Sequence, residues 1–328
     1  MISAPGEVFE LYMEYTKRPL TLKEQIEKLQ KRGLIVDDED LAMKYLSNIS
    51  YYRLRAYTYP FQDNKNPEAD HKFLREDIKF KDIIDLYCFD RRLRMLMFNA
   101  IEKIEVAVRC KLAMAYAIST GNSHWFTDKS LFMNAQKLNK DGTVTESYEK
   151  LLDDIDYEIE RSNEDFIKHY VDKYEEPYFP PAWMTFEVMS FGTLSKLYDE
   201  LKKSETKRNI AREFGLKNER ILENWLHAIS VWRNSCAHHG RVWNRRSIVN
   251  LMLPKDPVYP FIDKESLDNL HPNKVFTALS CIKYLINIIS PGSDLKNNIQ
   301  SIIKEGGRLL NLNEMGFPDN WETLDVWK

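Results

Sequence analysis

The stretch of sequence that decides the fold is KDIIDLYCFDRRLRMLMFNAIEKIEVAVRCKLAMAYAIS, residues 81–119. Its large apolar residues recur three or four positions apart, which is the spacing of residues on one face of an α-helix. The pattern contains no proline and continues almost to Gly121, much further than an ordinary globular helix extends. We therefore expect either one long spine helix or a long helix with a kink.

Helical patterns continue on the carboxyl side of this stretch. Apolar residues recur at helical spacing in further segments that we expect to be helices, near 146–172, 182–203, 205–214, 218–240 and 273–289. The tail from Gly306 to Lys328 is irregular, but its aromatic residues predict that it docks on the body of the protein. The chain is therefore expected to be all-α, a mainly helical bundle.

The amino-terminal side carries a smaller helical region. A capping box of Thr21 and Glu24 opens two short helices within residues 21–50, and Gly33 provides the turn between them. A helix-turn-helix and a plain helical hairpin both fit this arrangement. Alternating aromatic residues at 57–61 predict one short β element.

These patterns divide the chain into three expected parts. They are an N-terminal helical region at 1–74, a helical domain at 75–290 and a docked C-terminal tail at 291–328. The four cysteines lie far apart without a CxxC pair, which favours free thiols in a reducing cytosol. No signal peptide and no long uncharged apolar run is present, so we expect a cytoplasmic protein that makes no membrane contact.

A positive island marks the segment SVWRNSCAHHGRVWNRR, residues 230–246. The whole chain has a formal net charge of −3, so any surface for nucleic acid must be local. No acidic residue occurs from Asn224 to Lys255, and this absence is suited to binding a phosphate backbone. The residues expected to contact RNA are His239, Arg241, Arg245 and Arg246.

Arg233 and His238 are the candidate catalytic pair of this segment. A histidine with an unperturbed pKa of about 6.5 can take a proton from a 2′-OH or give one to the leaving oxygen. An arginine can donate hydrogen bonds to the charge that builds on the phosphorane. The products would be a 2′,3′-cyclic phosphate and a 5′-OH end, formed without a metal.

The spacing of this pair raises a geometric problem. Five residues correspond to roughly 140° around a helix, so one regular helix does not aim both side chains at one spot. Three solutions remain open: the helix distorts, Arg233 uses its length, or two copies of the motif face each other in a dimer. A continuous helix would instead align Asn234 with His238, Arg241 and Arg245, and Asn234 could then fix the tautomer of His238.

Glu105, within the long helical stretch, is a candidate accessory residue. It lies four residues before Arg109, so the two can simply form a surface pair. A functional reading places Glu105 beside the site, where it orients Arg233 or His238. The histidines show no metal-ligand spacing and no nucleotide-binding loop is present, so we expect no metal and no cofactor.

Residues 233–238, RNSCAH, match the RxxxxH signature of HEPN ribonucleases. The surroundings resemble the Abi (abortive infection) family of bacterial phage-resistance proteins, of the AbiD and AbiF kind. The resemblance extends from about residue 18 to the end of the chain. It is carried by ISYYRLRAY (49–57), YCFDRRLR (87–94), IEKIEVAVR (101–109), SFGTLS (190–195) and GFPDNW (316–321).

This resemblance implies an all-helical HEPN core within 75–290, related to the HEPN domains of RNA-guided CRISPR ribonucleases. It implies a homodimer with a composite active site, with Arg233 and His238 as catalytic residues and Asn234 as an accessory. The implied function is a metal-independent endoribonuclease in bacterial abortive infection, restrained by an inhibitory RNA or protein. Two alternatives stay open: a non-catalytic RNA- or protein-binding HEPN module of a defence or toxin–antitoxin system, and a DNA-binding regulator that uses residues 21–50.

Overall fold

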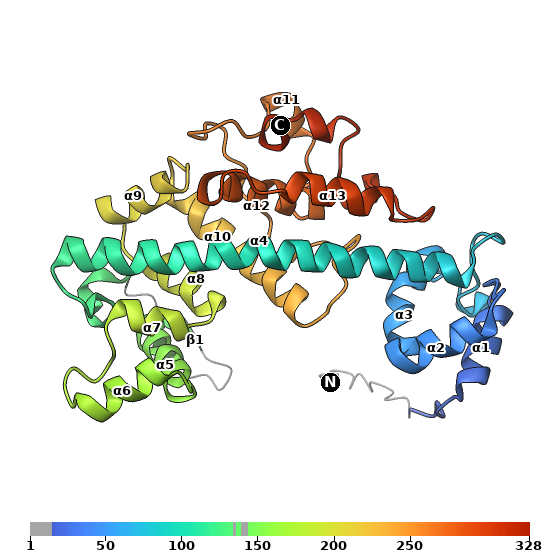
Figure 1. The fold of residues 1–328 in the computed structure, drawn as a ribbon, viewed down its shortest axis with the longest axis horizontal. Helices are drawn as coiled ribbons and strands as arrows, with labels where there is room; N and C mark the ends of the chain where they lie inside the picture. The colour runs from blue at the N-terminus through green and yellow to red at the C-terminus, as the bar shows by residue number, and fades with distance from the viewer. Residues whose placement is uncertain (1–14, 134–135, 139–143) are drawn as a thin grey trace, which may run out of the picture. The chain divides into compact units, whose positions relative to one another are not determined.

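The structure, a computed structural model, describes residues 15–133, 136–138 and 144–328, and within these ranges the regular structure is mostly helical (Figure 1). The expectation of an all-α fold is confirmed. The chain divides into two compact units, Met1–Tyr87 and Cys88–Lys328. The boundary falls inside α4, which runs from Phe80 to Thr120 as one helix and confirms the expected long spine.

The first unit contains three short helices before α4. They are α1 (Leu22–Lys31), α2 (Glu39–Ile49) and α3 (Tyr51–Thr58). The predicted capping box is present, since the Thr21 hydroxyl accepts from the Glu24 N–H and the Glu24 carboxylate accepts from the Thr21 N–H. Together with Arg18, these bonds lower the pKa of Glu24 to about 2.

The predicted strand at 57–61 is wrong. Ser50 caps a helix instead, because its hydroxyl accepts a hydrogen bond from the Arg53 N–H at 3.3 Å. A strand would have placed the alternating aromatic residues on one face, yet Tyr57 is 1% exposed whereas Tyr59 is 47% exposed. Burial follows the helical spacing of Leu54 and Tyr57, so core packing decides this segment against the short aromatic alternation.

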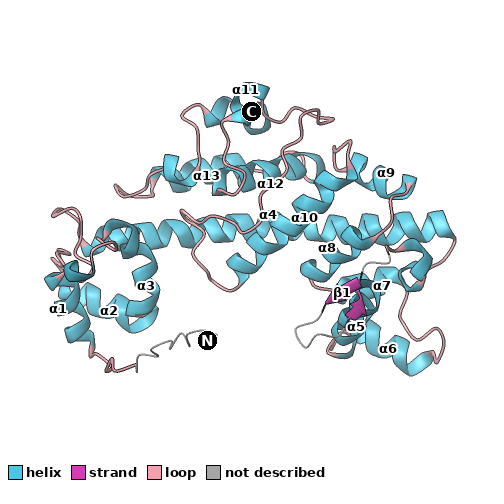
Figure 2. Ribbon diagram, turned by 180° about the vertical axis from the view of Figure 1, so that it is seen from behind, coloured by secondary structure: helices cyan, strands magenta, loops and turns pink. Residues whose placement is uncertain are grey.

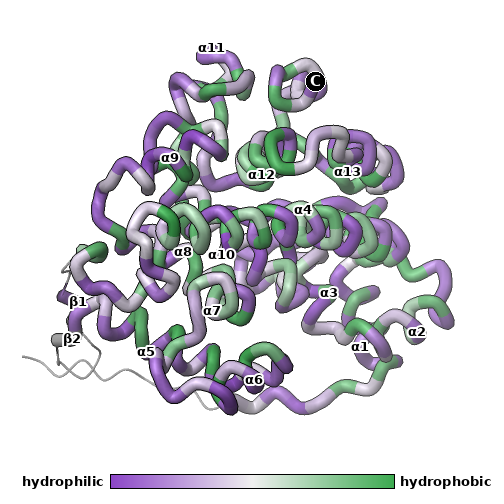
Figure 3. Tube along the Cα trace, turned by 60° about the vertical axis from the view of Figure 1, so that its left-hand side comes forward, coloured by the Kyte–Doolittle hydropathy of each residue, from purple (hydrophilic) through white to green (hydrophobic). Residues whose placement is uncertain are grey.

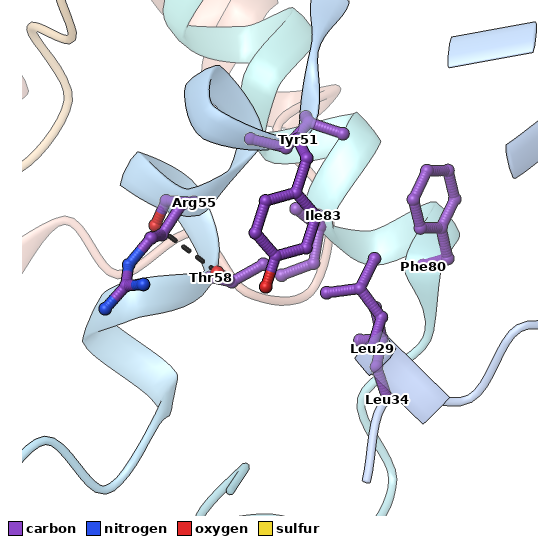
Figure 4. Close-up of a pocket in the computed structure, with 8 residues that line it drawn as sticks. Leu29, Leu34, Tyr51, Arg55, Thr58, Phe80 and Ile83 are labelled. Carbon is purple, nitrogen blue, oxygen red and sulfur yellow. Dashed lines mark hydrogen bonds between the residues drawn. The ribbon is translucent and has the colours of Figure 1, made fainter. Parts of the chain in front are cut away.

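A small cavity remains in the core of the first unit (Figure 4). Its volume is about 10 Å³, which is room for about one water molecule. Leu29, Leu34, Phe80 and Ile83 line it together with Tyr51 and Thr58. The cavity is therefore a packing defect between α1, α3 and α4 and is too small to bind a ligand.

The second unit is built from α4 and the remaining helices. Their bounds are α5 (Ser147–Glu160), α6 (Asp165–Lys173), α7 (Ala182–Val188), α8 (Phe191–Glu200), α9 (Glu205–Glu213), α10 (Glu219–Ala237), α11 (Lys264–Asp268), α12 (Val275–Ile289) and α13 (Leu295–Lys304). A short antiparallel hairpin joins β1 (Gln136–Leu138) to β2 (Val144–Glu146), with Lys137 opposite Thr145 (Figure 2).

Two helix predictions in this unit need correction, and one helix was missed. The expected helix at 146–172 breaks into α5 and α6, and the one at 182–203 breaks into α7 and α8. Ser190 causes the second break, because its hydroxyl accepts from the Thr193 N–H and so starts a new helix. Helix α13 was not predicted. Leu295, Ile299 and Ile302 form the buried face that stabilises it.

Helix α10 is central to the second unit and is covered by α8, α9 and α12. Helix α12 is hydrophobic along its length and lies next to α13, on the side of α4 away from α5 to α7 (Figure 3). The C-terminal aromatic residues Phe317, Trp321 and Trp327 are buried, and the Trp327 indole donates to the Ser280 hydroxyl on α12 at 2.9 Å. No helix in the described ranges combines the length and apolar character needed to cross a bilayer.

Candidate functional site

The candidate catalytic residues lie at the carboxyl end of α10. Asn218 starts this helix, because its side-chain oxygen accepts a hydrogen bond from the Arg220 N–H at 3.0 Å. A buried apolar face then holds the helix in the core, with Trp225, Leu226, Ile229 and Trp232 among its residues. The buried face of α10 therefore fixes the position of the polar motif at the surface.

Helix α10 ends inside the basic segment, after Ala237. The His239 N–H donates to the Cys236 carbonyl at 3.1 Å and the Gly240 N–H to the Ser235 carbonyl at 2.8 Å, as in a Schellman helix end. His239 takes the left-handed conformation that this end requires, with a φ of 57°. The helix predicted near 218–240 is therefore confirmed except for its last residues, and it does not continue through the later arginines.

Of the four residues that a continuous helix would have aligned, Asn234 and His238 stay together, while Arg241 and Arg245 lie in the loop beyond the helix. His238 caps the helix, and its N–H donates to the Asn234 carbonyl at 2.9 Å. Both side chains are exposed. In the described part of the chain they share no side-chain hydrogen bond, so the predicted contact that would fix the histidine tautomer is not formed.

Arg233 points away from this face, toward α4. Its Nε lies 3.5 Å from Oε2 of Glu105, and its guanidinium carbon is 5.6 Å from the ring centroid of Phe98. The Arg233 side chain is 31% exposed, so part of the guanidinium can still reach solvent or a ligand. Among the described residues, no hydrogen bond or ion pair joins Arg233 to His238. One copy of the chain thus holds the two residues on different sides of α10.

Glu105 belongs to a small ionic network. Its carboxylate is buried and pairs with both Arg109 and Arg233. Arg109 also donates to the Met189 carbonyl, just before α8, at 2.9 Å. Glu105 therefore forms the i, i+4 pair with Arg109, which is mostly buried and not a surface pair, and it also contacts Arg233. A buried carboxylate between two guanidinium groups restricts where Arg233 can point.

A second carboxylate on α4 holds the loop that follows the motif, and sequence reasoning did not single it out. Asp90 is fully buried and accepts hydrogen bonds from the backbone N–H groups of Val242 (3.1 Å) and Trp243 (2.5 Å). It also pairs with the buried guanidinium of Arg94. Asp90 and Arg94 have the same i, i+4 spacing as Glu105 and Arg109. This spacing was the sequence signal that could have identified Asp90.

The residues expected to bind RNA surround this loop. Arg241 packs over the ring of Trp243, with 5.8 Å between its guanidinium carbon and the ring centroid. His239 and Arg246 are exposed, and Arg245 is half-buried. Gly240 lets this loop close tightly, because a Cβ there would lie 3.2 Å from the Ser235 carbonyl oxygen and 3.4 Å from Arg245.

Cys236, in the middle of the motif, is not a nucleophile. Its side chain is buried, and burial together with the nearby Asp90 charge raises the pKa of the thiol to about 12. The thiolate needed for nucleophilic attack is therefore scarce at neutral pH. The groups available for chemistry are the exposed imidazole of His238 and the guanidinium of Arg233.

Comparison with known protein families covers the helices that carry the candidate site. A family model described as Abi-like protein matches residues 44–244, more than half of the chain. This chain belongs to the Abi-like protein family. No curated protein matches it, and no solved structure matches it.

The span matched to the Abi-like family ends one residue beyond Trp243. It therefore contains the candidate site residues on both α4 and α10. It includes Asp90 and Glu105 on α4 as well as Arg233 and His238 on α10. Within the described ranges, this Abi-like chain has no group of three or more His, Cys, Asp or Glu side chains that could hold a metal ion.

Proposed function

We propose that this protein is a metal-independent endoribonuclease of the HEPN type, of the AbiD or AbiF kind, acting in bacterial abortive infection. The observation that carries the proposal is the contact between Glu105 and Arg233. The buried carboxylate supports a role for Arg233 as a positioned cation, and His238, on another side of α10, stays exposed and available to substrate. Membership in the Abi-like family supports the role in phage defence.

In this proposal His238 takes the proton from a ribose 2′-OH. The freed O2′ attacks the adjacent phosphorus while the bond from phosphorus to O5′ breaks. A proton donor gives a proton to the leaving O5′, which becomes the 5′-OH. Arg233 donates to the non-bridging oxygens, where negative charge builds in the transition state. The products are a 2′,3′-cyclic phosphate and a 5′-OH end, and RNA is required because the nucleophile is the 2′-OH.

We also propose that two copies pair to complete the site. Within one copy Arg233 faces α4, whereas His238 faces solvent on another side of α10. An exposed apolar stripe on α4 adjoins Arg233 and comprises Met95, Phe98 and Val106, which are 60%, 37% and 47% exposed. At about 100° per residue these three side chains fall within roughly 80° of one another, so one partner surface can cover them.

The test is incubation of the purified protein with mixed cellular RNA in the presence of EDTA. The wild type is expected to cleave and to leave 2′,3′-cyclic phosphates, and His238→Ala and Arg233→Ala are expected to abolish cleavage. His169→Ala is the matched control, because His169 is exposed on α6 outside the site. Unchanged cleavage by His238→Ala would refute the site, and RNA binding without cleavage by the wild type would favour a non-catalytic binding module.

A further inference from the structure

Helices α8 and α10 pack against each other (Figure 2), and residues of both line a groove. Its volume is about 660 Å³, within the range of small-ligand sites. The α8 wall includes Gly192, from the SFGTLS segment that the sequence resemblance singled out, and Asp199. The α10 wall includes Arg220, His227 and Val231, and Met252 closes one side. This groove has no part in the chemistry described above.

The groove and His238 share one face of α10. Arg220, His227, Val231, Asn234 and His238 follow one another at intervals of seven, four, three and four residues. At about 100° per residue, these positions lie within roughly 60° of one another around the helix. With a rise of 1.5 Å per residue, His227 lies about 16 Å along the helix axis from His238. A strand that placed a phosphate at His238 could therefore continue along the groove.

The charges in the groove do not suit a row of phosphates. Asp199 and Glu223 line it, and Glu223 already pairs with the buried Lys207 at 2.6 Å. Lys196 is likewise paired with Asp154 at 2.8 Å. A phosphate chain would face the unpaired Asp199 carboxylate, with Arg220 as the one unpaired arginine or lysine among the described residues that line the groove, which is unfavourable for a row of phosphates.

The groups that do remain available match the edge of a nucleobase. Asp199, Arg220 and His227 are exposed, and their side chains form no hydrogen bond or ion pair in the described part of the chain. Asp199 can accept from an exocyclic amino group, while Arg220 and His227 can donate to ring nitrogens and carbonyl oxygens. Val231 and Met252 add apolar surface for the face of the base.

We propose that this groove binds an unpaired base of the RNA strand a few nucleotides away from the scissile phosphate, and that Asp199, Arg220 and His227 determine which base is accepted. The proposal rests on the ribonuclease function proposed above. It assigns a specificity role to residues outside the RxxxxH motif. It also explains why a polar groove with few free cations lies beside a basic segment.

The test measures binding and cleavage separately, using the full chain. The probes are fluorescent single-stranded RNAs of about ten nucleotides, of several base compositions, together with a dinucleotide too short to reach the groove. The variants are Arg220→Ala, His227→Ala and Asp199→Asn, and His169→Ala is the control. All of these side chains are exposed, so the variants are expected to fold, and circular dichroism checks this.

Arg220→Ala and His227→Ala are each expected to weaken binding of the longer RNAs about tenfold, as the loss of one good base contact does. Asp199→Asn is expected to change the order of affinities among base compositions. Cleavage of the dinucleotide is expected to stay unchanged in all three variants.

The possible failures are distinguishable. Wild-type binding that none of the three variants alters overturns the groove proposal and leaves the ribonuclease intact. Groove-dependent binding without any cleavage by the wild type supports the groove and contradicts the ribonuclease. No binding of any RNA by the wild type overturns both.

Discussion

Replacing Asp90 with alanine is expected to cost the second unit much of its stability. The carboxylate is fully buried and receives hydrogen bonds from the N–H groups of Val242 and Trp243 in addition to the Arg94 guanidinium. Arg94 is only 5% exposed, so the variant removes the carboxylate with which this buried cation pairs. Breaking a buried pair in this way typically costs about 3–5 kcal/mol. Total unfolding free energies are only about 5–15 kcal/mol.

Urea unfolding followed by far-UV circular dichroism measures this loss. With a slope of about 3 kcal/mol/M, a loss of about 4 kcal/mol lowers the midpoint of unfolding by a little over 1 M. Asp172→Ala is the matched control, because Asp172 is exposed on α6 and its loss is expected to change stability by less than about 0.5 kcal/mol.

A double variant separates the unpaired charge from the lost hydrogen bonds. Adding Arg94→Met to Asp90→Ala also removes the buried positive charge that has lost its carboxylate, so it is expected to recover part of the lost stability. A loss below about 1 kcal/mol for Asp90→Ala would contradict the stabilising role of this carboxylate. It would mean that contacts other than the carboxylate hold the loop after the motif.

Three further predictions concern the motif itself. His239→Gly is expected to raise the unfolding free energy by about 1 kcal/mol in thermal or urea unfolding, because glycine adopts a φ of 57° without the strain that a side chain causes. Glu105→Gln is expected to lower the proposed cleavage rate about 10- to 100-fold with little change in RNA affinity, since it loosens Arg233. Cys236 is expected to resist iodoacetamide at pH 8 in the folded protein, because its thiol, with a pKa of about 12, stays protonated below that pH, whereas the exposed Cys110 reacts.

Each of these has a result that contradicts it. A less stable His239→Gly variant would show that the imidazole makes contacts worth more than the backbone strain. An unchanged cleavage rate in Glu105→Gln would mean that Arg233 needs no positioning by α4. Labelling of Cys236 as fast as Cys110, measured by mass spectrometry, would show that the end of α10 opens readily.

The sequence by itself determined the helices, because a helix is specified by neighbours three and four residues apart. The long apolar period of α4 and the capping box at Thr21 needed no knowledge of the rest of the chain. The same local reasoning failed where signals compete. Aromatic alternation at 57–61 predicted a strand, whereas burial of Leu54 and Tyr57 in the core selects a helix.

The sequence also revealed the RxxxxH segment and the absence of acidic residues around it. Only the tertiary structure decided that Arg233 turns toward Glu105. It alone placed Asp90 against backbone groups more than 150 residues away in the chain. Backbone N–H groups carry no residue-type signature, and a buried carboxylate can be matched to its donors only when packing has brought the two segments together.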